Sequence, residues 1–303
     1  MRQIVRHSSL FVILSLAFSL SVPPAYAGTD SSSSSSSSGG VEVSLNSDKE
    51  ASGGYVLGTD PNPGFYIGLF GGGGASNNDP ITQKGTAFIT SPLGPLVVNA
   101  RGNADSHSAG MGGVHIGYEW RGWELGNPGS GWGILPALEF EGFYLGTTQT
   151  GTLNNPTPRV QEHRFFDSFS LDTGVVLANA VFTLQTPSRF RPYIGVGLGA
   201  ALVSVSGADS LQESPPEPGI NHFNSNPTAI GGNLAAQLKV GAHYEFTSHW
   251  SAFVEYRLLF INNTSYFFGS TVYPGIHAPT SPWKVGFGDM FFNLGVAGVD
   301  YRF

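Results

Sequence analysis

The sequence predicts an all-β protein, an eight-stranded antiparallel up-and-down β-barrel that crosses a membrane. Three observations lead to this prediction. The chain begins with an export signal, it combines 42 glycines and 13% aromatic residues with only 12% charged residues, and several segments alternate between apolar and polar or small residues. After the export signal no segment of 18 or more apolar residues occurs, which excludes membrane-spanning helices.

The first 27 residues are typical of a secretory signal peptide. Arg2 and Arg6 precede an apolar run (10–22), and the tripeptide AYA (25–27) provides a cleavage site between small residues. A permanent membrane anchor is the less favoured alternative, because the apolar run is shorter than the roughly 20 residues that a spanning helix needs.

Residues 28–63 are predicted to form a flexible periplasmic tether, and residues 64–303 the transmembrane barrel. An unbroken run of serines occupies 31–38, and such Ser/Gly-rich segments behave as solvated linkers. A contact of this tether with the cell wall is the functional alternative.

The charge balance excludes nucleic acid as a partner. Removal of the signal peptide takes away two of the 14 Lys and Arg residues, which leaves 12 against 21 Asp and Glu, or a net charge of about −9. The chain has no cysteine, so disulfides, thiolate metal sites and lipid attachment at an N-terminal cysteine are also excluded.

A period of two is clearest in five segments: 114–120, 137–144, 192–203, 234–246 and 250–258. In the fourth of these, Leu238 and Val240 face away from Gln237 and Lys239, as expected when one face meets lipid and the other the lumen. The closing segment from about residue 285, together with the two discussed next, brings the number of strands to eight.

Two segments fit the pattern less well. In 64–74, Tyr66 and Phe70 lie on the opposite face from Phe65, Ile67 and Leu69. In 166–185, the apolar face runs through Phe169, Leu171, Val175 and Leu177 and then shifts to Ala180, Phe182 and Leu184, which indicates either a β-bulge or a wrongly chosen face.

Long and short connections alternate along the chain. The long ones span 75–107, 147–162, 207–228 and 263–284, and the short ones lie near 121–131, 187–191 and 247–249. This predicts four extracellular loops, short periplasmic turns and periplasmic termini. The first long connection contains GTAFIT and PLVVNA, a possible further hairpin that would make ten strands if it entered the membrane.

Aromatic residues near the short turns are predicted to form the inner interfacial girdle: Trp120, Trp132, Tyr193, Trp250, Tyr301 and Phe303. The last strand must pair with the first, because lipid cannot satisfy an open sheet edge. Phe303 therefore needs no polar tail after it.

Four stretches resemble the small bacterial outer-membrane barrels of the opacity-protein and OmpA-like surface-antigen type. They are GFYIGLFGGG (64–73), RPYIGVGLGAAL (191–202), EFTSHWSAFVEYR (245–257) and VDYRF (299–303). The resemblance implies location in the outer membrane of a Gram-negative bacterium. It also implies outer-membrane lipid and the barrel-assembly machinery as partners, the latter through the C-terminal Phe303 strand. Such barrels include adhesins, recognition proteins, narrow pores and a few enzymes, so the resemblance does not specify an activity.

The inward faces carry a charged cluster: Glu119, Glu139, Glu141, Lys239, His243, Glu245, Glu255 and Arg257. The interior of an eight-stranded barrel is just wide enough for its own side chains. Buried charges there must be paired, so we expect an ion-pair network that plugs the lumen. The alternative is a narrow porin-like channel for small solutes or cations, favoured by the acidic excess.

Catalysis, cofactors and metals find little support in the sequence, and we expect no enzymatic activity. Ser106 and His107 are neighbours that point to opposite sides of a strand, whereas a hydrolase triad must converge in space. No helix follows the glycines of 195–199, so they do not indicate a dinucleotide loop. The eight histidines are scattered without paired ligand spacing.

The last long loop contains a cluster of aromatic residues that we predict to be a contact surface: Tyr266, Phe267, Phe268, Tyr273 and Trp283. The alternative is that the loops pack on one another as a lid. The preferred hypothesis is a surface-exposed protein with a mostly plugged lumen, whose loops serve adhesion or recognition of a host or cell-surface ligand.

Overall fold

The computed structural model describes residues 63–77 and 79–303. The predicted signal peptide and nearly all of the predicted tether lie outside these residues. The part of the chain that the structure describes contains no helical segment that could span a bilayer.

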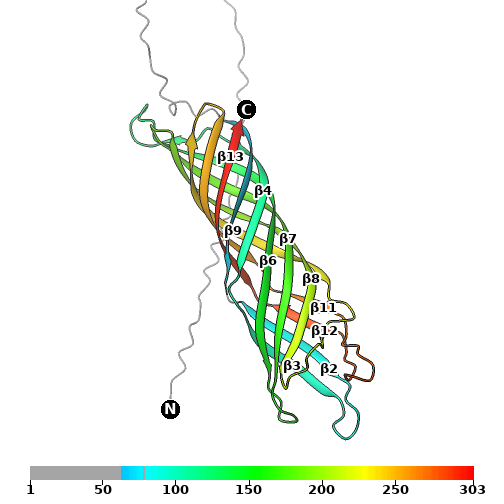
Figure 1. Ribbon diagram of the computed structural model, residues 1–303. Coiled ribbons are helices and arrows are strands. Elements are labelled where there is room, and N and C mark those ends of the chain that lie inside the picture. Colours follow the sequence, from blue (N-terminus) through cyan, green and yellow to red (C-terminus); the bar gives the residue numbers. More distant parts are fainter. Residues whose placement is uncertain (1–62, 78) are drawn as a thin grey trace, which may run out of the picture. The chain divides into compact units, whose positions relative to one another are not determined.

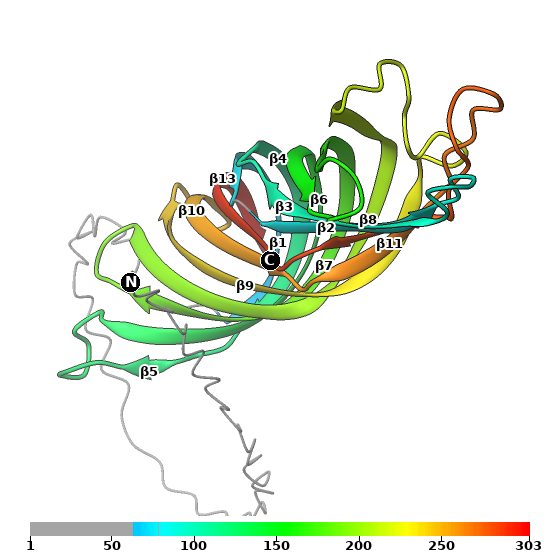
Figure 2. The ribbon, with the colours of Figure 1, turned by 90° about the horizontal axis from the view of Figure 1, so that it is seen from below.

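Eight strands form a closed antiparallel ring, which confirms the predicted fold class. They are β1 (Gly64–Ser76), β4 (Ser108–Glu119), β6 (Gly133–Asn155), β7 (His163–Gln185), β8 (Phe190–Ser214), β9 (Ala229–Glu245), β10 (Trp250–Ile261) and β13 (Met290–Arg302). Each pairs with its neighbours in this order, and β13 pairs back with β1 from Tyr66↔Arg302 to Ser76↔Phe292. Figure 1 shows the strands side by side, and Figure 2 shows the strong curvature of β7, β8 and β9.

One end of the barrel carries the short connections 120–132, 186–189 and 246–249, and we call it the turn end. The short strand β5 (Trp123–Glu124) lies within the first of them. The C-terminus lies at this end (Figure 1). We call the opposite end the loop end.

The sheet continues beyond the ring at the loop end. There β3 (Leu96–Ala104) pairs with the far part of β6, β2 (Pro80–Ala87) pairs with β3, β12 (Trp283–Phe287) pairs with β2, and β11 (Thr264–Phe268) pairs with β12. We call these four strands, together with the loops 215–228 and 269–282, the cap. Figure 1 shows β2, β3, β11 and β12 at the end farthest from the C-terminus.

The loops differ in their boundaries from those predicted from the sequence. The segments 147–162 and 207–228 are shorter loops than expected, because β6 and β8 have 23 and 25 residues, more than the roughly 9–11 needed to cross a bilayer. The hairpin within 75–107 exists as β2 and β3, but it joins the cap and leaves the ring at eight strands. Above the membrane, outward side chains need not be apolar, so the alternating pattern fades while the strands continue.

The uncertain face of 166–185 is also settled. Burial alternates along β7 without interruption, with Val175 and Leu177 inside and Ala180 and Phe182 outside. The strand therefore has no bulge between Leu177 and Ala180. The face that carries Val175 and Leu177, which the sequence analysis took as outward, points inward. The irregularity lies on β8 instead, where the register with β7 shifts near Gly207, a residue with a φ of 58°.

The ring presents apolar side chains to the outside. Leu198, Val176 and Val254 are 73%, 65% and 63% exposed, although water alone would favour their burial. The same face carries further exposed apolar side chains: Phe65, Ile67, Leu69, Val114, Ile116, Leu138, Phe140, Ile194, Val196, Leu202, Leu238 and Val240. A continuous apolar exterior of this kind matches the hydrocarbon of a bilayer.

Candidate functional site

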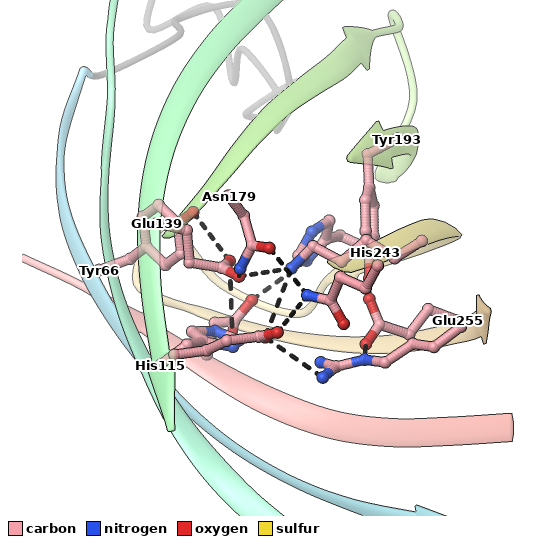
Figure 3. A network of polar contacts seen from close by, with 12 residues as sticks. Tyr66, His115, Glu139, Asn179, Tyr193, His243 and Glu255 are labelled. Carbon is pink, nitrogen blue, oxygen red and sulfur yellow. Dashed lines mark hydrogen bonds and ion pairs between the residues drawn. The ribbon is translucent and has the colours of Figure 1, made fainter. Parts of the chain in front are cut away.

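The lumen contains a network of paired charges, drawn in Figure 3. Lys239 of β9 forms an ion pair with Glu139 of β6, and its ammonium lies 3.9 Å from Glu141. Arg257 of β10 lies 3.2 Å from Glu141 and pairs with Glu255 on its own strand. The side chains of all five residues are at least 94% buried, so pairing offsets the desolvation of their charges.

Uncharged side chains donate further hydrogen bonds to two of these carboxylates, Glu139 and Glu255. The Tyr66 hydroxyl donates to Glu139 at 3.1 Å, and the Asn179 amide donates to the same carboxylate at 3.2 Å. The Tyr193 hydroxyl donates to Glu255 at 2.6 Å. Figure 3 shows Tyr66, Glu139 and Asn179 on one side of the network and Tyr193 and Glu255 on the other.

A second group of charges lies nearer the turn end. The Asp300 carboxylate lies 2.8 Å from His115 Nε2 and 3.2 Å from His243 Nδ1. Arg302 donates to Glu119 at 2.7 Å, and it shares β13 with Asp300. These contacts tie the closing strand through the interior to β4 and β9, the strands that lie beyond its two paired neighbours.

Arg191 extends the network to the remaining predicted residue. It donates to Glu245 at 2.6 Å and lies 3.8 Å from Glu119. The eight predicted lumen residues are therefore brought together, joined by four charged or titratable residues that the sequence analysis did not include: His115, Arg191, Asp300 and Arg302. All four have the inward parity of their strands, which is the signal that identifies them.

Two glycines make room for the network. An added Cβ at Gly117 would overlap the Tyr66 ring, and one at Gly68 would overlap His115 and the Asp300 carboxylate. The glycine enrichment of the sequence thus partly reflects an interior too crowded for side chains at every inward position.

Little free volume is left within the charge network. The cavity enclosed by the network has a volume of about 30 Å³, room for roughly one or two water molecules. Next to the network on the loop-end side lies a layer of apolar side chains, all at most 5% exposed: Phe70, Phe143, Leu145, Leu259 and Leu294. The Arg257 guanidinium lies 4.2 Å from the centre of the Phe70 ring, where the two regions meet.

The aromatic residues predicted for the girdle lie outside at the turn end, with one exception. Trp120, Trp132, Trp250 and Phe303 are 45%, 45%, 50% and 72% exposed, and Tyr301 packs against both Trp250 and Phe303.

Tyr193 was wrongly assigned to this girdle. It is 6% exposed and points into the lumen, because its position on β8 has the parity of the inward Arg191 and not that of the outward Ile194.

The described chain is a transmembrane β-barrel. No known protein-family model and no curated protein sequence matches it. Solved structures of similar fold include Neisserial surface protein A, 15% identical, with 79% of this chain and 97% of that chain covered and a TM-score of 0.30. The outer membrane protein OprG from Pseudomonas aeruginosa is 14% identical (79% and 96% covered, TM-score 0.38). The outer membrane protease OmpT from Escherichia coli is 11% identical (78% and 97% covered, TM-score 0.37). These low similarities carry no argument about the ligand or activity of this barrel.

The aromatic cluster predicted as a contact surface is mostly buried in the cap. Tyr266, Phe268 and Trp283 are at most 2% exposed, Tyr273 is half-buried, and only Phe267, at 64%, is exposed. Their rings pack with aromatic residues of β7, β12 and the loop 215–228: Phe169, Phe223 and Phe287. The loops thus form a lid, the alternative reading of the sequence, because burial of these rings is more favourable than their exposure.

The cap also gathers histidines that are far apart in the sequence. The Glu217 carboxylate lies 3.4 Å from His222 and 3.3 Å from His277. Burial alone raises the pKa of Glu217, but the two imidazoles outweigh it and lower this pKa to about 2. The nearby Glu217 carboxylate raises the pKa of His277. Sequence spacing could not reveal this cluster, because its members belong to two loops separated by β9, β10 and β11.

The serine–histidine neighbours do not form a nucleophile–base pair. The Ser106 hydroxyl donates to the backbone carbonyl of Ser76, and His107 Nε2 lies 2.9 Å from the Thr150 hydroxyl. The Asp105 carboxylate accepts a hydrogen bond from Thr150 rather than from His107, so the order of contacts differs from that of a catalytic triad.

We predict that Glu139→Gln lowers the free energy of unfolding by about 3–5 kcal/mol, because it leaves the Lys239 ammonium buried without its principal counter-charge. The double variant Glu139→Gln with Lys239→Met should recover much of this loss. Urea unfolding in phospholipid vesicles measures both effects.

The matched control is Glu213→Gln at the exposed pair between Glu213 and Arg164, whose side chains are 41% and 52% exposed. It should cost less than about 1 kcal/mol. Equal losses at Glu139 and Glu213 would contradict the assignment of a structural role to the lumen network.

Proposed function

We propose that this protein is an integral outer-membrane barrel that presents its cap to a host or cell-surface partner and whose lumen does not conduct. The observation that carries the proposal is the filled lumen combined with a structured cap. A lumen whose charge network encloses a cavity of only about 30 Å³ offers little to a solute, whereas a cap built from two hairpins and two loops offers a surface.

The cap presents apolar side chains to the outside. Val97 of β3 and Ile276 and Val272 of the loop 269–282 are 67%, 78% and 48% exposed, and Phe88 and Leu93, in the adjoining connection between β2 and β3, are 48% and 46% exposed. Contiguous patches of exposed apolar groups are typical of contact sites. These residues replace the buried Tyr266, Phe268 and Trp283 as candidates for partner contact.

The alternative function, a narrow channel for small solutes or cations, requires a hydrated path through the lumen. The ion-pair network and the apolar region beyond it oppose such a path, because an ion entering them would lose its water without gaining equivalent ligands. The serine–histidine geometry likewise supports a non-enzymatic role.

Planar-bilayer recordings of the purified protein are expected to show no well-defined unitary current. The reason is that the buried rings of Phe70 and Phe143 occupy the interior next to the charge network. Discrete currents that change in amplitude with Glu139→Gln or Lys239→Met would contradict the plugged lumen and favour the channel.

We predict that Val97→Ser together with Ile276→Ser weakens adhesion of cells displaying the protein to host-cell monolayers by about tenfold, through loss of apolar contact area. Trp123→Ser is the matched control, since Trp123 is 64% exposed at the turn end. It should leave adhesion unchanged. Adhesion that survives replacement of all four long loops would refute the recognition role.

A further inference from the structure

Two loops of the cap bring three potential metal ligands to one point. Glu217 and His222 belong to the loop 215–228, and His277 belongs to the loop 269–282. Glu217 Oε2 lies 3.4 Å from His222 Nε2 and 3.3 Å from His277 Nε2. The ligand atoms of all three residues lie within 4.8 Å of one another.

The nitrogen–oxygen distances match those between ligands of a shared ion. Zn²⁺ holds nitrogen and oxygen ligands at roughly 2.0–2.2 Å in a tetrahedron, which places neighbouring ligand atoms about 3.3–3.6 Å apart. Hydrogen bonds from N–H to oxygen are shorter, mostly about 2.9–3.0 Å. Consistently, Glu217 Oε2 is buried without a well-formed hydrogen bond in the described part of the chain.

The tautomer of His222 points to the same conclusion. Its Nδ1 lies 2.8 Å from the backbone carbonyl oxygen of Ser210, which can only accept, so Nδ1 carries a proton. In the neutral ring, Nε2 then has a lone pair on the side of the Glu217 oxygen. Two lone pairs at this distance repel unless a proton or a metal cation lies between them, and histidines that bind metals are commonly oriented by such an Nδ1–H···O=C bond.

The surrounding side chains hold His222 in place. Its ring packs edge-on against Phe165 and Trp283, with centroids 5.3 and 5.9 Å apart. Its backbone carbonyl accepts a hydrogen bond from the Thr271 hydroxyl at 2.9 Å, which connects the two loops. These contacts hold the His222 ring in one orientation, so its Nε2 is held on the side of the Glu217 carboxylate.

An adjoining cavity gives an ion access to these ligands. It has a volume of about 220 Å³ and is lined by Glu217, His222, His277 and His163. His163 Nδ1 is buried and has no hydrogen-bond partner among the described residues. His163 lines the same cavity but is not among the three residues whose ligand atoms lie within 4.8 Å of one another.

We propose that Glu217, His222 and His277 bind one divalent transition-metal ion, zinc, which joins the two loops of the cap. Two imidazole nitrogens and one carboxylate suit Zn²⁺, whereas Ca²⁺ and Mg²⁺ take oxygen ligands. The proposal does not rest on the recognition role, because the site would stabilise the cap whether or not the cap binds a partner.

A second cluster of potential metal ligands, in the lumen, differs from the cap cluster in its surrounding charges. His115, Glu139 and Glu141 also lie within reach of a common ion, but they surround the positive charges of Lys239 and Arg257. Protein cations already neutralise that group. No Lys or Arg side chain forms an ion pair with Glu217 in the described residues.

The test is zinc binding by the tag-free, EDTA-treated full-length protein in detergent, measured by competition with a chromophoric chelator. We expect one Zn²⁺ per chain, and Co²⁺ in its place should give the visible absorption of a tetrahedral nitrogen and oxygen site. Glu217→Gln, which conserves shape, and His277→Ala should each weaken binding by about 100-fold or more. His249→Ala, in the turn 246–249 at the opposite end, is the matched control and should bind as the unmodified chain does.

The mobility of each unheated variant on gels, compared with the boiled sample, verifies that the barrel is folded. Zinc should also slow proteolysis within 215–228 and 269–282 in the unmodified protein but not in Glu217→Gln. The proposal is overturned by absence of zinc binding, which would leave a histidine–carboxylate ion pair, or by equal binding in all variants. Preference for Ca²⁺ or Mg²⁺ over Zn²⁺ would also overturn it.

Discussion

The pairing of β1 with β13 is the constraint on which the rest of the structure depends. Every backbone N–H and C=O group within hydrocarbon must be hydrogen-bonded inside the protein, so a sheet can cross a membrane only if it has no edge. The register from Tyr66↔Arg302 to Ser76↔Phe292 removes the two edges that the eight-stranded meander would otherwise leave. Closure of the ring is what gives each strand one face toward lipid and one face toward the lumen.

Closure also fixes the width of the lumen, and the lumen chemistry follows from that width. Eight strands enclose a space that side chains fill, so charges placed there cannot stay hydrated and must meet one another. The lumen holds ion pairs in its turn-end half and a layer of aromatic and aliphatic side chains beside them. At the loop end, β6, β7 and β8 continue past the shorter strands, and β2, β3, β11 and β12 occupy the places that those strands leave.

The sequence predicted the barrel well where lipid dictates the pattern. Leu198 and Val196 had to be apolar and their neighbours small, so the face, the strand and its partners could be inferred from parity alone. The inward charges followed from the same parity, and Tyr193 was misplaced because its aromatic character was given more weight than its parity. Beyond the membrane, the alternation of apolar and polar residues no longer predicts which side chains are buried. Phe267 and Phe268 are both aromatic, but only Phe268 is buried.

Contacts that depend on three-dimensional convergence could not be inferred in the same way. The cap hairpin β2–β3 joins β6 through strand pairing that no local signal specifies, and Glu217 meets His277 from a loop sixty residues earlier in the chain. Loop closure over such distances is decided by the packing of the whole cap, in which Trp283 and Phe223 take part. Spacing rules for metal ligands address only residues on one local element.

The most direct test of the account is disulfide cross-linking of the first strand to the last in isolated outer membranes. The natural chain has no cysteine, so Leu69→Cys with Val299→Cys, which face each other across β1 and β13, introduces a single pair. Closure predicts an oxidant-dependent cross-link within one chain, and none when Leu69→Cys is combined with Leu198→Cys on β8. Failure of the first pair to cross-link within a chain, while the protein remains in the membrane, would contradict a closed barrel.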